Sequence, residues 1–344
     1  MLVSVLVMVL TALWCAPARA DGERGADTVT RTTLAADTEI PQGATVELLR
    51  RTMALDAGEK RHLRGRLETT SSTTGIIGLT QRIRCLNASG STVSVIAASA
   101  RNHEGADTAT YAVPGHLPIY ADLLFTAPAA GVYNCVLQGS AYSTLAGSNH
   151  LTAVAGNTWL EADDGDRPGA HWWQNPACES ADAAGACTYV GGGAARRDAW
   201  IFYDDGTPVH QWQAHPDAVG VSARANVELT TCYQGTASCA PTMQAYPRGR
   251  NAVVDTRFEF IQLDTTGHAC RTHGAPARRT ITDDAHHAVG YFAISGIPID
   301  AACGTRTFLM RVYVKHVSGQ TVKIDGVQGG VTSLTNGIAV NDFG

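Results

Sequence analysis

Basic charge, aromatic side chains and long apolar runs are all scarce in this sequence. Only 17% of the 344 residues are charged and 7% are aromatic, and acidic residues outnumber basic ones by 31 to 26. This net charge of −5 argues against nucleic-acid binding, which needs a basic surface. Beyond residue 20, no segment approaches the run of about 18 apolar residues that a membrane-spanning helix needs. What is present, 44% hydrophobic residues and 35 glycines, is typical of globular proteins, and the length allows two domains.

Compact catalytic and cofactor motifs are also missing. The sequence has no Gly-x-Ser-x-Gly, no His-Glu-x-x-His, no phosphate-binding glycine loop and no EF-hand ligand ladder. We therefore expect neither a cofactor nor a resident metal, and we favour a non-enzymatic protein. Catalytic carboxylates or histidines can also be dispersed along a chain without leaving a motif. An exported hydrolase of carbohydrate or peptide therefore stays open as an alternative.

The first twenty residues have the features of a cleaved secretory signal. An apolar run from Leu2 to Ala16 is followed by Ala18-Arg19-Ala20, the small-x-small pattern at which signal peptidase cuts. No basic residue precedes the run, which is unusual for such a signal. The alternatives are a membrane anchor, for which the run is short, and lipidation at Cys15. Cleavage after Ala20 predicts a secreted, extracellular protein with no membrane span in its mature form.

Cysteine usage agrees with export. Nine cysteines are present, and removal of Cys15 leaves an even number, which predicts disulfides in an oxidising compartment. We predict that they pair in sequence order: Cys85–Cys135, Cys178–Cys187, Cys232–Cys239 and Cys270–Cys303. A metal site at His268, Cys270 and His273 is the alternative for one pair, because imidazole and thiolate lie close together there.

Hydrophobic residues repeat with a period of two over most of the chain, which predicts strands. Met310, Val312 and Val314, for example, alternate with polar neighbours at Arg311, Tyr313 and Lys315, as in a strand with one wet face. Turn residues separate these segments at the spacing of a β-sandwich. We predict a mainly β protein with two β-sandwiches in tandem, divided as follows: an extended arm over 21–41, a sandwich over 42–162, a disulfide-stapled, aromatic-rich linker over 163–198, a second sandwich over 199–330 and a tail over 331–344.

A weak internal repeat supports two related sandwiches. The segment from Ile119 to Pro128, followed by a strand, is similar to the segment from Val289 to Pro298, followed by a strand. The offset is about 170 residues. Similarity of this kind also arises by chance between two β-rich segments.

Residues 130–135, Ala-Gly-Val-Tyr-Asn-Cys, resemble the start of strand F in immunoglobulin domains. There a tyrosine two residues before a cysteine forms a corner, and that cysteine bridges the two sheets. The resemblance implies an immunoglobulin-like sandwich over 42–162, with Cys85 as the partner of Cys135. The tryptophan that packs on this bridge in antibody domains is missing between the two cysteines. A sandwich of this kind implies no particular function.

The middle of the chain is acidic and rich in tryptophan. Residues 161–224 hold ten acidic and four basic residues and four of the six tryptophans. Aromatic faces beside carboxylates suit stacking on a sugar ring or anchoring a protein partner. We predict a ligand-binding loop at His171, Trp172 and Trp173, together with Tyr189. Trp200 and Phe202 are predicted to be buried on one face of a strand. The alternative is that the rings fill the junction between the sandwiches.

Two acidic segments could hold a cation, although a solvated loop is the favoured interpretation of both. Residues 161–166, Glu-Ala-Asp-Asp-Gly-Asp, crowd oxygen ligands on a turn but lack the alternate-residue spacing of a calcium loop. Residues 283–287, Asp-Asp-Ala-His-His, could bind a divalent cation or hold a base. Adjacent side chains of an extended segment point to opposite sides, which weakens that interpretation.

These observations predict a secreted, non-enzymatic protein that binds a surface glycan or a protein partner through the central aromatic loop. Besides the hydrolase, a third hypothesis is a structural or assembly subunit. In that case, the N-terminal arm would add a strand to a neighbouring sheet edge.

Overall fold

The structure is a computed structural model that describes residues 28–71, 77–100, 116–143, 150–173, 188–191, 197–202, 211–231, 251–281, 287–326 and 334–344. Strands account for almost all of the regular structure in these ranges, and the one helical element there is a 3-10 turn, Ala301–Cys303. Among the residues described, no helix has the length and apolar character needed to cross a membrane.

Alternation of buried and exposed side chains explains the strands. In β19 (Thr307–Gly319), Met310, Val312 and Val314 are buried, whereas Lys315 is exposed and Tyr313 is half-buried. The sequence predicted this division of β19 into an apolar and a wet face. Burial of one apolar face per strand drives the sheets together in pairs.

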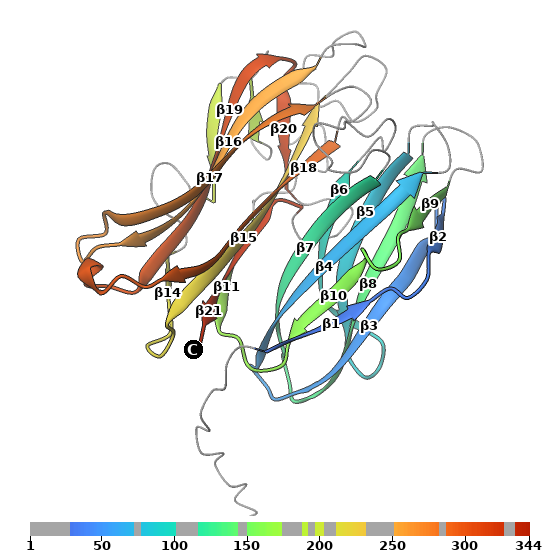
Figure 1. Ribbon diagram of the computed structural model, residues 1–344, viewed down its shortest axis with the longest axis horizontal. Helices are drawn as coiled ribbons and strands as arrows, with labels where there is room; N and C mark the ends of the chain where they lie inside the picture. The colour runs from blue at the N-terminus through green and yellow to red at the C-terminus, as the bar shows by residue number, and fades with distance from the viewer. Residues whose placement is uncertain are drawn as a thin grey trace, which may run out of the picture.

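Two sheets form the first sandwich (Figure 1). Sheet A contains β1 (Val29–Thr33), β2 (Thr38–Pro41), β4 (Lys60–Ser71), β7 (His116–Thr126), β9 (His150–Ala153) and β10 (Trp159–Asp163). Sheet B contains β3 (Thr45–Leu55), β5 (Ile77–Leu86), β6 (Thr92–Ala100) and β8 (Gly131–Ser143). The core between them is aliphatic, with Leu63, Leu67, Ile83 and Leu137 fully enclosed.

The second sandwich again consists of two sheets. Sheet C contains β11 (Gly169–Trp173), β12 (Thr188–Val190), β15 (Gly220–Thr231), β18 (His287–Pro298), β20 (Val322–Asp325) and β21 (Asn336–Asp342). Sheet D contains β13 (Asp198–Ile201), β14 (Gln211–Gln213), β16 (Ala252–Leu263), β17 (Ala269–Ile281) and β19. Its core is separate from the first and more aromatic, with Phe258, Phe260 and Phe308 fully buried. The two tandem β-sandwiches predicted from the sequence are confirmed.

Both sandwiches have the same strand order. In sheet A, β7 pairs with β4, which pairs with β9 and β10, and these pair with β2 and β1. Sheet C repeats this order as β18, β15, then β20 and β21, then β12 and β11. Sheets B and D run β3-β8-β5-β6 and β13/β14-β19-β16-β17. Each half is therefore an eight-position jelly roll of two Greek keys.

The predicted internal repeat corresponds to this duplication, since its two segments are β7 and β18, each followed by the next strand of its half. Register places Tyr120 opposite Arg66 in the first half and Tyr291 opposite Asn226 in the second. Tyr120 and Tyr291 are thus equivalent residues, 171 positions apart.

The immunoglobulin-like strand arrangement is not confirmed, although part of its local motif forms. The hydroxyl of Tyr133 donates a hydrogen bond of 2.6 Å to the carbonyl of Ala129, as in a tyrosine corner. The disulfide Cys85–Cys135 is present, but its cysteines are direct register partners on neighbouring strands of sheet B. The expected bridge between two sheets is therefore wrong, because β5 and β8 lie in one sheet.

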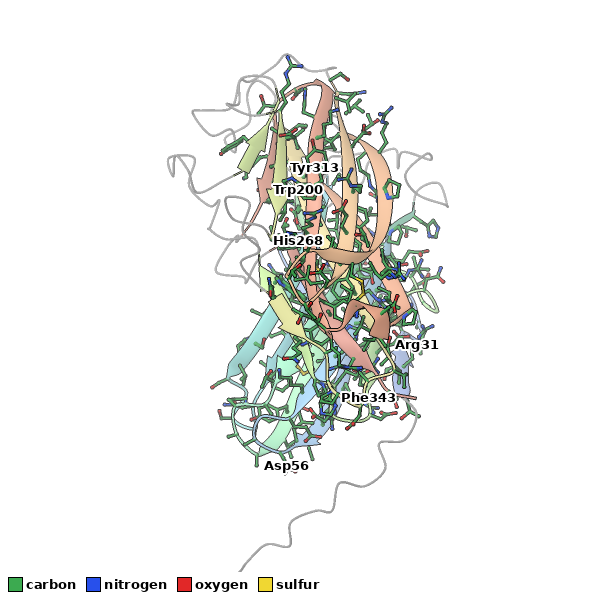
Figure 2. All side chains as sticks on the ribbon, turned by 90° about the vertical axis from the view of Figure 1, so that its left-hand side faces the viewer. Arg31, Asp56, Trp200, His268, Tyr313 and Phe343 are labelled. Atoms are coloured by element: carbon green, nitrogen blue, oxygen red, sulfur yellow. A yellow bond between two sulfur atoms is a disulfide. The ribbon has the colours of Figure 1, made fainter. Side chains whose placement is uncertain are left out.

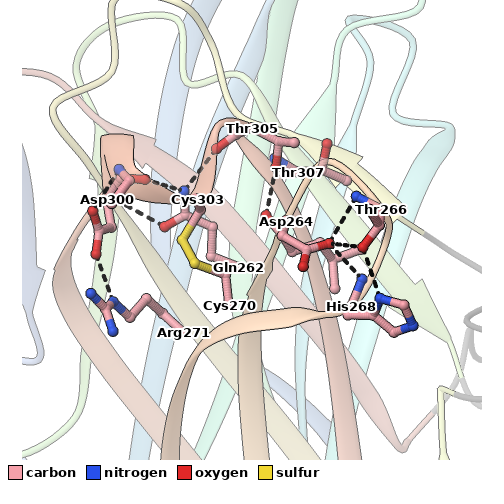
Figure 3. Close-up of a disulfide and its surroundings, with 12 residues drawn as sticks. Gln262, Asp264, Thr266, His268, Cys270, Arg271, Asp300, Cys303, Thr305 and Thr307 are labelled. Atoms are coloured by element: carbon pink, nitrogen blue, oxygen red, sulfur yellow. Dashed lines mark hydrogen bonds and ion pairs between the residues drawn. A yellow bond between two sulfur atoms is a disulfide. The ribbon is translucent and has the colours of Figure 1, made fainter.

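A second predicted disulfide, Cys270–Cys303, joins the start of β17 to the 3-10 turn (Figure 3). The other four cysteines that were predicted to pair, Cys178 with Cys187 and Cys232 with Cys239, lie outside the described residues.

Three of the predicted boundaries are corrected. The arm over 21–41 is described from residue 28, and there β1 and β2 pair with β10 and β9 of the same chain rather than with a neighbour. The linker is short: β10 ends at Asp163 and β11, in the second sandwich, begins at Gly169. The tail contains β21, a strand flanked on both sides in sheet C. β21 is buried on both faces, so it lacks the alternation that marks a half-buried strand.

The two sandwiches meet through a stack of aromatic and charged side chains. The rings of Tyr120 and Tyr291 lie parallel, with centroids 4.5 Å apart, and Arg64 lies over both. Asn226 of β15 donates a hydrogen bond of 2.9 Å to the carbonyl of Tyr120. A small apolar contact, Leu124 against residues of β21, lies beside this stack.

Asp122 is the buried anion of this interface. It is 2% exposed, and His62 Nε2 lies 2.8 Å from its Oδ1. Burial acts to raise the pKa of Asp122, but the hydrogen bond with His62 and the charges of His62, Arg224 and Arg64 lower it below its usual value. Asp122 is therefore ionised at neutral pH and is held by cations from both halves.

A second buried carboxyl group, Glu228 of β15, contacts the first sandwich through Ser99. The backbone N–H and the hydroxyl of Ser99 each lie 3.2 Å from an oxygen of Glu228. Burial, reinforced by repulsion from Asp325, raises the pKa of Glu228 well above its usual value. The folded protein thus favours the protonated form of Glu228, whereas the unfolded chain ionises it at lower pH.

Replacement Glu228→Gln is expected to flatten the pH dependence of stability. A carboxyl group whose pKa is raised on folding stabilises fully below its unfolded pKa, and this contribution is lost as the pH rises through the folded pKa. Glutamine mimics the protonated form, so the variant should be more stable than the parent by roughly 1–3 kcal/mol at alkaline pH and nearly equal to it at about pH 4. Denaturant melts over that pH range measure this; parallel pH profiles for the two proteins would show that Glu228 ionises normally.

Candidate functional site

The structure does not assemble the predicted aromatic loop as a stacking surface. Trp172 lies in β11 opposite Gly337 of β21, and its side chain, 1% exposed, belongs to the core of the second sandwich. The prediction of an accessible Trp172 is therefore wrong. Position 337 must be glycine for this packing, because a Cβ there would lie 2.2 Å from Met310 Sδ and would clash with it.

The other three predicted residues are dispersed. His171 faces the sandwich interface, and burial lowers its pKa to about 3, so it is neutral at physiological pH. Tyr189 is half-buried on β12, which occupies the same edge of sheet C as β11 but lies further along it. The backbone of Trp173 lies in β11, and its side chain falls outside the described residues. The predicted set is divided between two separate strands of sheet C, β11 and β12.

The predicted burial is confirmed for Phe202 and corrected for Trp200, and the two do not share a face. Ala199 and Ile201 of β13 are buried in the core, so Trp200 between them points to the outer face of sheet D and is half-buried. Phe202, which is buried, follows the strand with a positive φ of 63° and so does not share the face of Trp200. The alternation of side chains between two faces does not extend to Phe202, because β13 ends at Ile201.

The sequence-based cation sites receive no support from the residues described. In the acidic segment 161–166 the carboxylates have separate partners, including Arg31 for Glu161, Arg51 for Asp164 and the N–H of Lys60 for Asp166. Figure 3 shows Cys270 bonded to Cys303, which removes its thiolate as a ligand, and His268 Nδ1 lies 2.8 Å from Thr266 Oγ1. Residues 283–286 lie outside the described residues.

The outer face of sheet D carries aromatic and charged side chains in two adjacent rows. Register across the four strands β13, β19, β16 and β17 gives the aromatic row Trp200, Tyr313, Arg257 and Pro276. The same register, two residues along each strand, gives the charged row Asp198, Lys315, Asp255 and Arg278. In Figure 2 Trp200 and Tyr313 lie next to each other on the face of the second sandwich turned to the viewer.

Guanidinium groups hold the rings of the aromatic row in place. The rings of Trp200 and Tyr313 are tilted by 45° with centroids 4.8 Å apart. Arg311 lies 4.2 Å from the centroid of the Trp200 ring, and Arg257 lies 5.3 Å from that of Tyr313. Glu259, buried between them, accepts a hydrogen bond from each arginine. Cation–π contacts and ion pairs of this kind restrict side-chain rotation before any ligand binds.

Ion pairs also order the charged row. Arg278 donates two hydrogen bonds to Asp255, of 2.6 and 2.8 Å, and hydrogen bonding from Arg278 is the main cause of the lowered pKa of Asp255. The hydroxyl of Tyr313 donates a 2.7 Å bond to Asp198, which raises the pKa of Tyr313. Asp255 therefore remains an ionised acceptor at neutral pH.

A shallow groove of about 660 Å³ lies over these rows. Its lining consists of Asp255, Thr256, Arg257, Pro276, Ala277, Arg278, Tyr313 and Lys315. A volume of this size is typical of small-ligand sites. An aromatic ring, one ionised acceptor and N–H donors thus meet in one concave surface, the combination that binds a ring bearing hydroxyl groups.

Sequence reasoning identified this face as wet but not as a site. Tyr313 and Lys315 were recognised as the polar positions of β19, whereas Trp200 was predicted to be buried in the core. Arg257 and Arg278 come from β16 and β17, far from Trp200 in sequence, and only the register brings the rows together. The available signal was the alternation of the charged residues Asp255, Arg257 and Glu259 with the uncharged residues Val254, Thr256, Phe258 and Phe260 in β16.

Comparisons with known proteins show only distant likenesses. No family model matches the chain, and no curated protein matches it. Among solved structures, the VP2 subviral particle of infectious bursal disease virus matches 98% of this chain with 10% identity and a TM-score of 0.31, and the chain spans 46% of that protein. The tandem CBM22-1-CBM22-2 domain of Paenibacillus barcinonensis Xyn10C matches 92% of this chain and 98% of its own, with 10% identity and a TM-score of 0.23. Likenesses at these scores say nothing about what this chain does.

Proposed function

We propose that this chain is a secreted, non-enzymatic binding protein that takes a glycan in the groove on the outer face of sheet D. The observation that carries the proposal is the aromatic row, in which Tyr313 lines the groove with Arg257 and Pro276 beside it. Extracellular location is supported by the disulfides Cys85–Cys135 and Cys270–Cys303, which persist in oxidising compartments.

Size and shape favour a glycan over a protein partner. A groove of about 660 Å³ matches a small ligand, whereas a stable protein interface buries roughly 800 Å² on each side. The row of four strands is roughly 14 Å wide at the usual strand spacing, enough for a short oligosaccharide laid across it. Aromatic faces contact the apolar side of a sugar ring, while carboxylates and guanidinium groups bond to its hydroxyl groups.

The state of the groove carboxylate favours binding over hydrolysis. A general acid in a glycosidase needs a raised pKa. Asp255 has a lowered pKa because Arg278 bonds to it, so it holds no proton to give at neutral pH. Asp255 is therefore suited to accept hydrogen bonds from a bound sugar.

The test is binding of the full chain to an array of oligosaccharides, comparing Tyr313→Ala with Tyr189→Ala. Both tyrosines are half-buried on strands of the second sandwich, but Tyr189 belongs to the aromatic set predicted from sequence. We expect Tyr313→Ala to weaken binding about tenfold or more, the effect of losing one stacked ring, and to cost at most about 1–2 kcal/mol of stability. Loss of binding in Tyr189→Ala alone would move the site to sheet C. No binding by the parent protein would overturn the proposal.

A further inference from the structure

We propose that the groove selects sugars that carry a carboxylate, such as uronic acids, through a clamp formed by Arg257 and Lys315 around Tyr313. This inference rests on the proposed glycan-binding function and adds the charge of the ligand. Two features of the groove carry it: the placement of two cations around one ring, and the fact that neither the terminal nitrogens of Arg257 nor the ammonium group of Lys315 bonds to a described residue.

The placement follows from register. Arg257 on β16 is the direct partner of Tyr313 on β19, so their side chains are neighbours across the two strands. Lys315 is two residues further along β19 and shares the same face, roughly 7 Å from Tyr313. All three side chains line the groove. A ring stacked on Tyr313 therefore has a cation at its edge in two directions.

The cations of this face differ in the donors that they have available. Arg278 is bound by Asp255 through two hydrogen bonds, and Arg311 is bound by Glu259. Arg257 uses only its Nε toward Glu259, and its two terminal nitrogens have no hydrogen bond to any described residue. Lys315 is exposed and forms no ion pair within the described part of the chain.

Local charge has the sign opposite to that of the whole protein. The groove lining contains three cations, Arg257, Arg278 and Lys315, and one anion, Asp255, an excess of two positive charges. The chain as a whole carries a net charge of −5. A positively charged groove attracts anionic ligands and has little electrostatic effect on the binding of neutral ones.

The geometry of the guanidinium group favours a carboxylate among anions. The terminal nitrogens of arginine present parallel N–H groups that match the two oxygens of a planar carboxylate. A carboxylate attached to the edge of a sugar ring lies beside the ring, where Arg257 and Lys315 reach it while the ring stacks on Tyr313. A sulfate ester extends further from the sugar ring than a carboxylate does, so a sulfated sugar tests whether the groove selects a carboxylate or any anion.

The experiment presents the full chain with uronate-bearing oligosaccharides, each alongside its carboxyl-reduced neutral form and a sulfated neutral form. We expect about tenfold or stronger binding of the uronate form, the effect of one charge-assisted contact, and a decline of this preference at high salt. Lys315→Gln should reduce the preference and Lys315→Arg should restore it. The matched control is Arg271→Gln, which removes an exposed cation that is paired with Asp300 and lies at the start of β17, outside the groove lining.

The outcomes separate the clamp from the proposed function. Equal binding of uronate and reduced forms overturns the clamp and leaves the glycan-binding function in place. Preference for the sulfated form, or an unchanged preference in Lys315→Gln, also overturns the clamp. Absence of binding to every form overturns the proposed function, and the clamp falls with it.

Discussion

Replacement of Asp122 by alanine is expected to lower the free energy of unfolding by about 3–5 kcal/mol, the usual cost of removing one partner from a buried ion pair. The variant leaves His62, Arg64 and Arg224 without the carboxylate that they share across the sandwich interface. Denaturant melts at neutral pH measure the loss. Asp217→Ala is the matched control, because the Asp217 side chain is 77% exposed and should change stability by less than about 0.5 kcal/mol.

Asp122 also determines how the stability of the protein should change at acidic pH. The pKa of Asp122 is lowered on folding, so its stabilisation is complete above the unfolded pKa and is lost as the pH falls through the folded pKa. Asp122→Asn, which keeps an acceptor for His62, should recover part of the stability and flatten the acid limb. Equal midpoints for the parent and Asp122→Ala would mean that the interface does not depend on this charge.

Replacement of Trp172 by alanine is expected to destabilise the protein by about 3–5 kcal/mol, as deletion of a buried aromatic side chain does. The indole is 1% exposed among the core residues of the second sandwich, and alanine would leave a cavity there. Chemical denaturation followed by far-UV circular dichroism measures the change without relying on tryptophan fluorescence.

The matched control is Trp200→Ala, which removes an indole of the same size from the outer face of sheet D. It should cost about 1 kcal/mol, mainly from its contacts with Tyr313 and Arg311, and it should weaken glycan binding. If Trp172→Ala does not fold well enough to measure, Trp172→Phe keeps most of the volume and should still lose about 1–2 kcal/mol. A larger loss in Trp200→Ala than in Trp172→Ala would reverse this assignment of core and surface.

Local patterns in the sequence were sufficient for the architecture. Alternation in β19 marked its wet face, and the similarity between β7 and β18 revealed the duplication. The pairings Cys85–Cys135 and Cys270–Cys303 followed from proximity in sequence. The alternation lies within one strand, and the repeat compares two short local segments, so neither signal requires knowledge of long-range strand pairing.

The candidate site could not be predicted from local patterns, because it depends on how distant strands pair. Its residues come from four strands between Asp198 and Lys315, and only register places them in rows. Trp172 illustrates the same limit, because nearby glycines and prolines indicated a loop, whereas pairing with β21, more than 160 residues later, makes it a core strand residue. Long-range pairing overrides local composition in both cases.

The two sandwiches bring different charges to the interface between them. Arg64 and Arg224 occupy equivalent positions, opposite Asp122 and Ala293 respectively. One carboxylate therefore neutralises two equivalent arginines when unlike halves meet. Two second halves meeting through this face would bury two arginines with no carboxylate, which costs several kcal/mol. The interface thus disfavours the pairing of two second halves through this face.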